Sequence, residues 1–212
     1  MDYEIIEIGQ KPKSSMMIDT SFKLLKIKNC FDFNLLSDIA LKYEPSIMEL
    51  PVHKVKGNEN LHNTITARHF LYNVFDYPDF DFFKEVLKNT ASLYFQIHNQ
   101  PFQPFGATGW FNILREEVNI NNHNHLFYRE SDFDYLFAIN CCIACNETYT
   151  VFFDPYTKKT TKIENKNGEM YFFPSWVTHR TEQTNGTRIT MAFDCSRDPE
   201  KFLDNRQWEW IK

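Results

Sequence analysis

The sequence predicts a mainly β fold with flanking helices (α+β), in which an antiparallel barrel or sandwich follows a mixed helical region. Aromatic residues make up 17% of the 212 residues, with 21 Phe and 10 Tyr, and aromatic side chains pack well on a pleated sheet. In the second half of the chain, short aromatic or β-branched segments follow one another between turn residues. Such a succession is typical of a β-barrel or sandwich.

Two helices are expected in the N-terminal half. Residues 31–45 have apolar side chains at helical spacing, with Asp32 or Asn34 as the N-cap and Pro45 as the end. Residues 76–100 repeat apolar side chains every three or four positions, which predicts an amphipathic helix.

All the expected elements fit one domain of residues 1–212. Residues 1–105 form an N-terminal mixed helix and strand support region, residues 106–197 the barrel core, and residues 198–212 a C-terminal arm or short helix. The expected strands are residues 2–8, 22–28, 107–116, 134–142, 148–154, 157–164, 169–176 and 188–195.

The charge balance and the apolar content exclude some classes of function. The formal net charge is −5 and no long basic run is present, which argues against a dedicated nucleic-acid or membrane-surface binder. No apolar segment resembles a signal peptide, and none reaches the roughly 18 residues of a membrane span. The 5 cysteines are unevenly spaced and match neither a disulfide framework nor a zinc ribbon. A reduced, cytoplasmic protein is expected.

The stretch NINNHNHLFY, residues 119–128, contains two histidines two positions apart, His123 and His125. On a strand, residues two apart project to the same side, whereas on a helix they point about 200° apart. A strand would therefore make the pair a two-pronged metal ligand. Two polar residues on a solvated strand would give the same pattern, so the pair alone leaves both interpretations open.

A second group of polar residues follows the stretch MYFFPSW. His179 comes just after it, and Arg188 and Thr190 begin a strand nine residues later. Arg188 and Thr190 share one face of that strand, while the other face is apolar. An arginine can hold a carboxylate by two parallel hydrogen bonds. Two interpretations of Arg188 stay open: it binds the carboxylate of a ligand in a pocket, or it forms an ion pair at the surface.

The order of these motifs resembles that of the iron(II)- and 2-oxoglutarate-dependent oxygenases, in particular the prolyl-hydroxylase-like branch and its small bacterial and phage-borne relatives. The resemblance covers about residues 108–196. It implies a double-stranded β-helix, the jelly-roll and cupin-like barrel. It also implies a dioxygenase that hydroxylates a substrate C–H with O₂ and releases succinate and CO₂, with Fe(II) and 2-oxoglutarate bound and ascorbate as a reductant.

The same resemblance assigns the iron ligands. His123 matches the first ligand and His179 the distal one. Most members carry Asp or Glu two residues after the first histidine, where this sequence has His125. We expect His125 to be the third ligand; the alternatives are water, or a carboxylate such as Asp134 or Asp154.

The resemblance also assigns the co-substrate site. Arg188, helped by Thr190, matches the group that holds the far carboxylate of 2-oxoglutarate. Asn112 and Tyr135 are expected to line the pocket. Tyr128 or Tyr135 would supply the tyrosine hydroxyl that some relatives place there.

Two other functions explain part of this pattern. A three-histidine, cupin-type iron dioxygenase that oxidises thiols needs no 2-oxoglutarate and leaves Arg188 without a role. A barrel that binds a sugar or peptide without redox chemistry would also suit the aromatic content. For the 2-oxoglutarate-dependent dioxygenase, the expected substrate group is a peptidyl or small-molecule C–H, but the sequence does not identify the substrate. The remaining histidines are expected to be structural or at the surface: His53, His62, His69 and His98.

Overall fold

The computed structural model describes residues 1–9, 11, 13–14, 21–52, 59–125, 135–145, 147–154, 157–183, 185–201 and 207–212, with the backbone alone for residues 135 and 136. In these ranges the chain is mainly β, with flanking helices. The α-helices are α1 (Phe33–Met48) and α2 (Asp81–Ile97). The strands are β1 (Asp2–Ile8), β2 (Phe22–Lys28), β3 (Phe105–Leu114), β4 (Tyr135–Ala144), β5 (Tyr149–Phe153), β6 (Thr160–Glu164), β7 (Met170–Phe173), β8 (His179–Thr181), β9 (Arg188–Ser196) and β10 (Glu209–Ile211).

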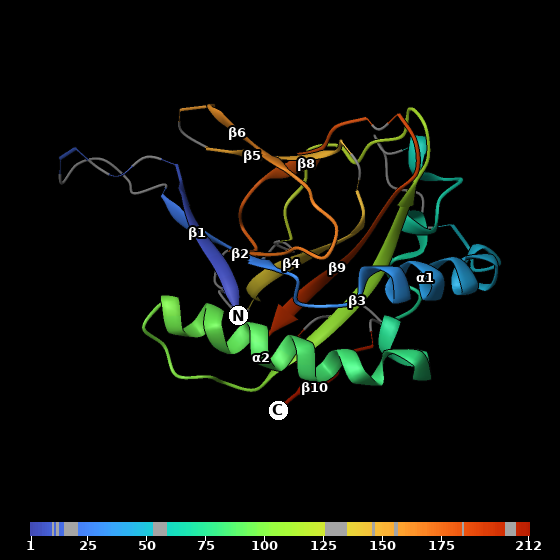
Figure 1. Ribbon diagram of the computed structural model, residues 1–212, viewed down its shortest axis with the longest axis horizontal. Helices are drawn as coiled ribbons and strands as arrows, with labels where there is room; N and C mark the ends of the chain where they lie inside the picture. The colour runs from blue at the N-terminus through green and yellow to red at the C-terminus, as the bar shows by residue number, and fades with distance from the viewer. Residues whose placement is uncertain are drawn as a thin grey trace.

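The strands form two antiparallel sheets (Figure 1). The large sheet has the order β1-β2-β7-β4-β9-β3-β10 and the small sheet the order β6-β5-β8. Strand β9 lies between β3 and β4, with which it makes the longest pairings of the large sheet. The two facing antiparallel sheets form a double-stranded β-helix, which confirms the predicted fold class.

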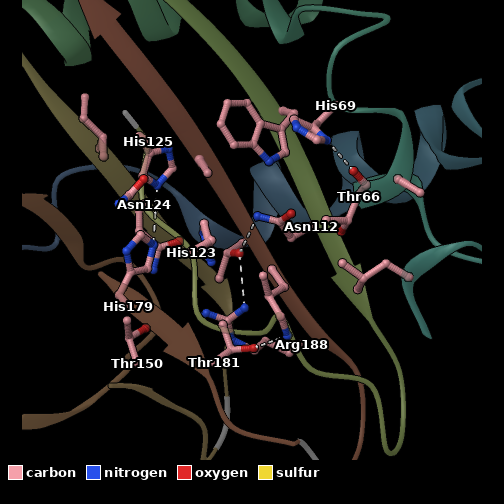
Figure 2. A pocket seen from close by; sticks show the side chains of 18 of the residues that line it. Thr66, His69, Asn112, His123, Asn124, His125, Thr150, His179, Thr181 and Arg188 are labelled. Carbon is pink, nitrogen blue, oxygen red and sulfur yellow. Dashed lines mark hydrogen bonds between the residues drawn. The ribbon is translucent and has the colours of Figure 1, made fainter. Parts of the chain in front are cut away.

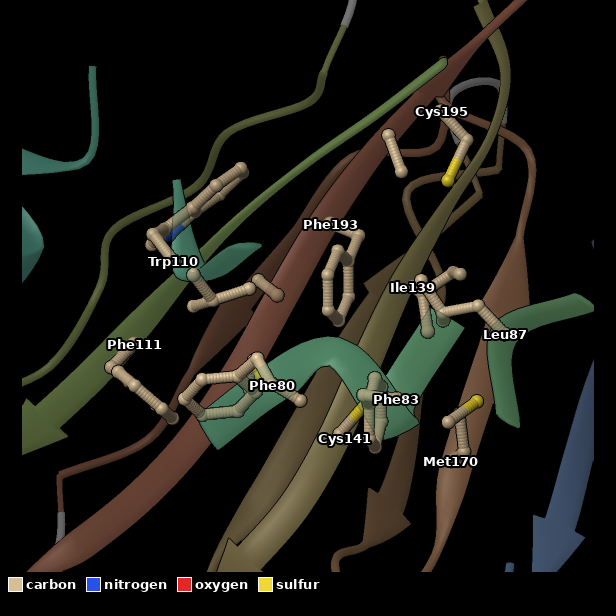
Figure 3. Close-up of a cluster of buried hydrophobic side chains, with 14 of the residues drawn as sticks. Phe80, Phe83, Leu87, Trp110, Phe111, Ile139, Cys141, Met170, Phe193 and Cys195 are labelled. Carbon is tan, nitrogen blue, oxygen red and sulfur yellow. The ribbon is translucent and has the colours of Figure 1, made fainter. Parts of the chain in front are cut away.

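The two faces of the large sheet pack against different layers, and the face towards the small sheet also carries buried polar side chains. On β4, Ile139 belongs to the core shared with α1 and α2, whereas Ala138 belongs to the core shared with the small sheet. This alternation follows from the two-residue period of a strand. On the helix side, Phe83 of α2 stacks on Phe193 of β9 with ring centroids 5.8 Å apart (Figure 3). Gly109 of β3 makes room for that ring, since a Cβ there would lie 2.2 Å from it.

Both predicted helices form, and α2 confirms the predicted apolar spacing, whereas α1 leaves Leu35 and Leu41 exposed and does not end where the sequence predicts. The Asp32 side chain accepts hydrogen bonds from the backbone N–H groups of Asn34 and Leu35, which makes it the N-cap. The helix continues through Pro45 to Met48, so the predicted end is wrong. Ile47 is fully buried in that last turn, and its burial offsets the hydrogen bond that proline cannot make. Among the described residues, no helix is long and apolar enough to cross a membrane.

Two short strands are absent from the sequence prediction. Strand β8 pairs with β5, and β10 pairs with β3 at the edge of the large sheet. Strand β10 lies where an arm or short helix was expected. Three residues are too few to show a strand period, so only the partner strand decides their conformation. Strand β2 pairs with β7, so the proposed support region shares a sheet with the proposed barrel core.

Candidate metal centre

His123 and His179 lie directly opposite each other across an isolated antiparallel bridge. The backbone N–H of each donates to the carbonyl oxygen of the other at 2.9 Å. Directly opposed residues of an antiparallel pair project to the same face, and the two ring centroids are 4.2 Å apart. The expectation of a regular strand at His123 and His125 is wrong, because this bridge is the only strand-like pairing within residues 119–125.

His125 reaches the same place by a separate backbone contact. Its N–H donates to the carbonyl oxygen of Ser175 at 2.9 Å, in the turn that precedes β8. The His125 ring stacks on that of His179, with centroids 5.1 Å apart and planes 9° apart. One nitrogen of each of the three histidines lies within 4.8 Å of the other two.

The hydrogen bonds of the three rings determine where their protons lie. Nδ1 of His123 faces the carbonyl oxygen of Asn121 at 2.8 Å, and Nδ1 of His179 faces that of Val177 at 3.1 Å. Nδ1 of His125 faces Oδ1 of Asp194 at 2.5 Å. A carbonyl or carboxylate oxygen accepts, so each Nδ1 donates, and in a neutral ring Nε2 keeps its lone pair.

Burial keeps two of the rings neutral. Burial, with a smaller contribution from the neighbouring His125, lowers the pKa of His123 from 6.5 to about 4. Burial also lowers the pKa of His179 well below 6.5, with smaller contributions from His123 and His125. Neutral imidazole is the form that binds a metal ion.

The geometry fits a shared ion. Nε2 of His125 and Nε2 of His179 are 3.4 Å apart, and in neutral rings that donate from Nδ1 both of these nitrogens carry lone pairs. Two nitrogens about 2.1 Å from one metal ion stand about 3.0–3.4 Å apart for angles between octahedral and tetrahedral. A cation between these rings would convert a repulsive contact into an attractive one.

The three histidines line a cavity of about 440 Å³ between the two sheets (Figure 2). Trp110 of β3 and Phe173 of β7 contribute apolar walls. Arg188, Thr190 and Asn112 also line it. The structure thus brings the sequence-predicted histidines and the sequence-predicted arginine to one cavity.

Arg188 is a buried cation, with 1% of its surface exposed. Its Nη1 donates to Oγ1 of Thr190 at 3.4 Å, and Asn112 donates to the same oxygen at 3.4 Å. Nε of Arg188 and Oδ1 of Asn112 are buried without a hydrogen-bond partner in the described part of the chain. No carboxylate of those residues lies within ion-pair distance of the guanidinium. A buried unpaired charge is costly, so this end of the cavity suits an anionic ligand.

The other predicted site residues lie elsewhere or are not described. Tyr128 and Asp134 fall outside the described residues, as does the side chain of Tyr135. Asp154 accepts a hydrogen bond from the backbone N–H of Thr157 in the turn after β5. It lines a different hollow, so it does not complete the histidine cluster.

Two residues of the site were missed: His69, which lines the cavity, and Asp194, whose carboxylate contacts His125. His69, expected to be structural or at the surface, lines the cavity from the segment before α2, and its ring lies 5.3 Å from that of Trp110. Nothing in the sequence near His69 signals this position. Asp194 had a signal, because it lies at an even spacing from Arg188 and Thr190 on β9 and so shares their face.

No family model matches the sequence, and no curated protein matches it. Solved structures do match the fold. A prolyl hydroxylase from Trichoplax adhaerens, in complex with a hypoxia inducible factor oxygen degradation domain peptide fragment, has a TM-score of 0.57 and 12% identity over 87% of each chain.

Two bacterial structures are similar in the same way. An oxidoreductase of the 2OG-Fe(II) oxygenase family from Burkholderia pseudomallei has a TM-score of 0.54 and 13% identity over 82% of this chain and 84% of that one. A Pseudomonas putida prolyl-4-hydroxylase has a TM-score of 0.52 and 9% identity over 82% and 88%. The predicted resemblance is therefore confirmed at the level of the fold.

Proposed function

We propose that the protein is an Fe(II)- and 2-oxoglutarate-dependent dioxygenase that hydroxylates a C–H group of a substrate still to be identified. The observation that carries the proposal is the pairing of two features in one cavity. One ring nitrogen of each of three histidines there lies within 4.8 Å of the other two, and a buried guanidinium there has no carboxylate partner among the described residues. A metal ion and a carboxylate ligand would together satisfy both.

The residues of the chain have separate tasks in this proposal. His123, His125 and His179 would hold Fe(II), and Arg188 would hold the far carboxylate of 2-oxoglutarate by parallel hydrogen bonds. The bound iron and 2-oxoglutarate supply the oxidising chemistry, with release of succinate and CO₂. Thr190 keeps the guanidinium in place through its 3.4 Å hydrogen bond.

Two aromatic rings form apolar walls beside the histidine cluster. The ring of Phe173 lies 4.8 Å from that of His179, and the ring of Trp110 lies 6.2 Å from that of His125. A low-dielectric wall strengthens the attraction between a bound cation and its ligands. It also protects an oxidising centre from side reactions with solvent.

The departure from the usual ligand set is compatible with iron. Non-haem Fe(II) sites commonly use two histidines and one carboxylate, and imidazole is itself a good iron ligand. With His125 in place of the carboxylate, the ligand set carries no negative charge.

An anaerobic titration tests metal and co-substrate together. Fe(II) and 2-oxoglutarate are added while the visible charge-transfer band of the iron chelate is recorded. We expect the band only when both are present, and we expect His179→Ala to abolish it. His98→Ala is the matched control, because His98 caps the end of α2 and does not line the cavity. Absence of the band from the unaltered protein would refute the proposal.

The three-histidine ligand set also supports a thiol-oxidising iron dioxygenase that uses no 2-oxoglutarate. This alternative leaves the buried Arg188 without an assigned partner, so it ranks second. Oxygen consumption measured with a panel of small thiols, with and without 2-oxoglutarate, separates the two. Thiol oxidation without 2-oxoglutarate would favour the alternative.

A further inference from the structure

We infer that Asp194 is the positioning residue of this centre: from β9 it holds His125 in the orientation and protonation form that a metal ion requires. This inference deepens the proposed function and rests on its metal site. Asp194 does not belong to the three-histidine cluster. It acts on the cluster through Nδ1 of His125, which it contacts directly.

The contact between the two side chains is short and buried. Oδ1 of Asp194 lies 2.5 Å from Nδ1 of His125. Asp194 is 2% exposed and His125 is 6% exposed, so little water competes for the hydrogen bond. Because Asp194 pairs with Ala138 and Thr108 in the middle of the large sheet, the carboxylate is held on a rigid base.

His125 differs from the other two histidines in what holds it. His123 and His179 donate from Nδ1 to backbone carbonyl oxygens, which no side-chain substitution removes. His125 donates to a side-chain carboxylate. The orientation of that one ring, and the placement of its lone pair on Nε2, therefore depend on a single replaceable group.

Asp194 also restores charge to the site. His125 occupies the position at which the predicted ligand pattern would have a carboxylate, and an imidazole ring supplies no negative charge. The carboxylate of Asp194 lies on the other side of the same ring and polarises it through the hydrogen bond. A carboxylate hydrogen-bonded to a ligating histidine raises its basicity, and loss of such a partner commonly lowers metal affinity about 10- to 100-fold.

The test compares Asp194→Asn, Asp194→Glu and Glu169→Gln. Glu169 is the matched control: it is a buried carboxylate, 5% exposed, that pairs with Lys26 at 3.0 Å and does not line the cavity. Circular dichroism first verifies that each variant is folded. The first readout is NMR of the labelled ring nitrogens of His125 in metal-free protein, which reports the tautomer.

The second readout is the affinity for Fe(II) alone, measured anaerobically. We expect Asp194→Asn to lower the Nδ1-protonated fraction of His125 and to weaken Fe(II) binding about 10- to 100-fold. Asp194→Glu should recover part of both, and Glu169→Gln should change neither. An unchanged His125 tautomer in Asp194→Asn would overturn the inference, whatever the metal affinity.

Failure of the proposed function gives a different result. If the unaltered protein binds no Fe(II), the metal site is refuted, whereas the tautomer of His125 still decides whether Asp194 positions the ring. Equal loss of Fe(II) affinity in Asp194→Asn and Glu169→Gln would show a general effect of removing a buried carboxylate and would also overturn the inference.

Discussion

Replacing Arg188 with methionine should change stability and ligand binding in opposite directions. The side chain is 1% exposed, and in the described part of the chain its guanidinium has a hydrogen bond to Thr190 but no carboxylate partner. Methionine keeps much of the side-chain volume and removes the charge. The substitution therefore separates a structural arginine from one that is held ready for a ligand.

The expected magnitudes follow from these contacts. The hydrogen bond to Thr190 contributes about 1 kcal/mol, while burying an unpaired charge costs several kcal/mol. Without ligands, we expect Arg188→Met to leave the free energy of unfolding unchanged or to raise it by up to about 2 kcal/mol. Losing one partner of a buried charge pair costs about 2–5 kcal/mol of binding, so Kd for 2-oxoglutarate should rise about 30- to 4,000-fold.

Urea denaturation of the metal-free protein measures the first quantity, and anaerobic titration of the Fe(II) form with 2-oxoglutarate measures the second. Arg197→Met is the control, because Arg197 is exposed; it should affect neither. A loss of more than about 2 kcal/mol of stability with an unchanged Kd would refute the reasoning. Arg188 would then be a structural residue whose partner is a neighbouring group of the fold.

Three further predictions concern the core, the pH dependence and the ligand position. Gly109→Ala should lower the free energy of unfolding by about 1–3 kcal/mol, because its Cβ would lie 2.2 Å from a buried ring, whereas Gly186→Ala has open space and should be neutral in the same urea experiment. The pKa of His123 falls from 6.5 to about 4 on folding, so the unfolded chain takes up a proton at a higher pH than the folded protein. The contribution of His123 to the free energy of unfolding should therefore be fully present above pH 6.5 and decrease as the pH falls towards 4. Urea titrations across this range should show a smaller decrease in His123→Gln than in the unaltered protein. His125→Asp places a second carboxylate beside Asp194, so it should lower the stability of the metal-free protein. Adding Asp194→Asn should recover that stability. No recovery in the double variant would contradict the contact between His125 and Asp194.

The regular elements were largely readable from the sequence because their signals are local. The alternation in residues 22–28 predicted a strand that the structure places at Phe22–Lys28. The helical spacing of residues 76–100 predicted α2, and Phe83, Leu87, Ala91 and Phe95 are buried at that spacing. The sequence did not predict strand β10 or the continuation of α1 past Pro45, because each depends on burial against a distant partner.

In the candidate site, too, the features with a local sequence pattern were predictable and those without one were not. The spacing of Arg188 and Thr190 predicted a shared polar face, and both residues line the cavity. The same spacing extended to Asp194, but no local pattern shows that this carboxylate meets a ring 69 positions earlier in the chain. His69, which was expected to be structural or at the surface, lines the cavity.

The sequence by itself determined the kinds of side chain available and the faces on which regular strands present them, because these depend on residue type and a two-residue period. Tertiary structure decided which faces meet. The bridge between His123 and His179 joins residues 56 positions apart through two hydrogen bonds, outside any long strand. Such contacts are fixed by how the sheets pack around a common cavity, and packing is a property of the whole chain.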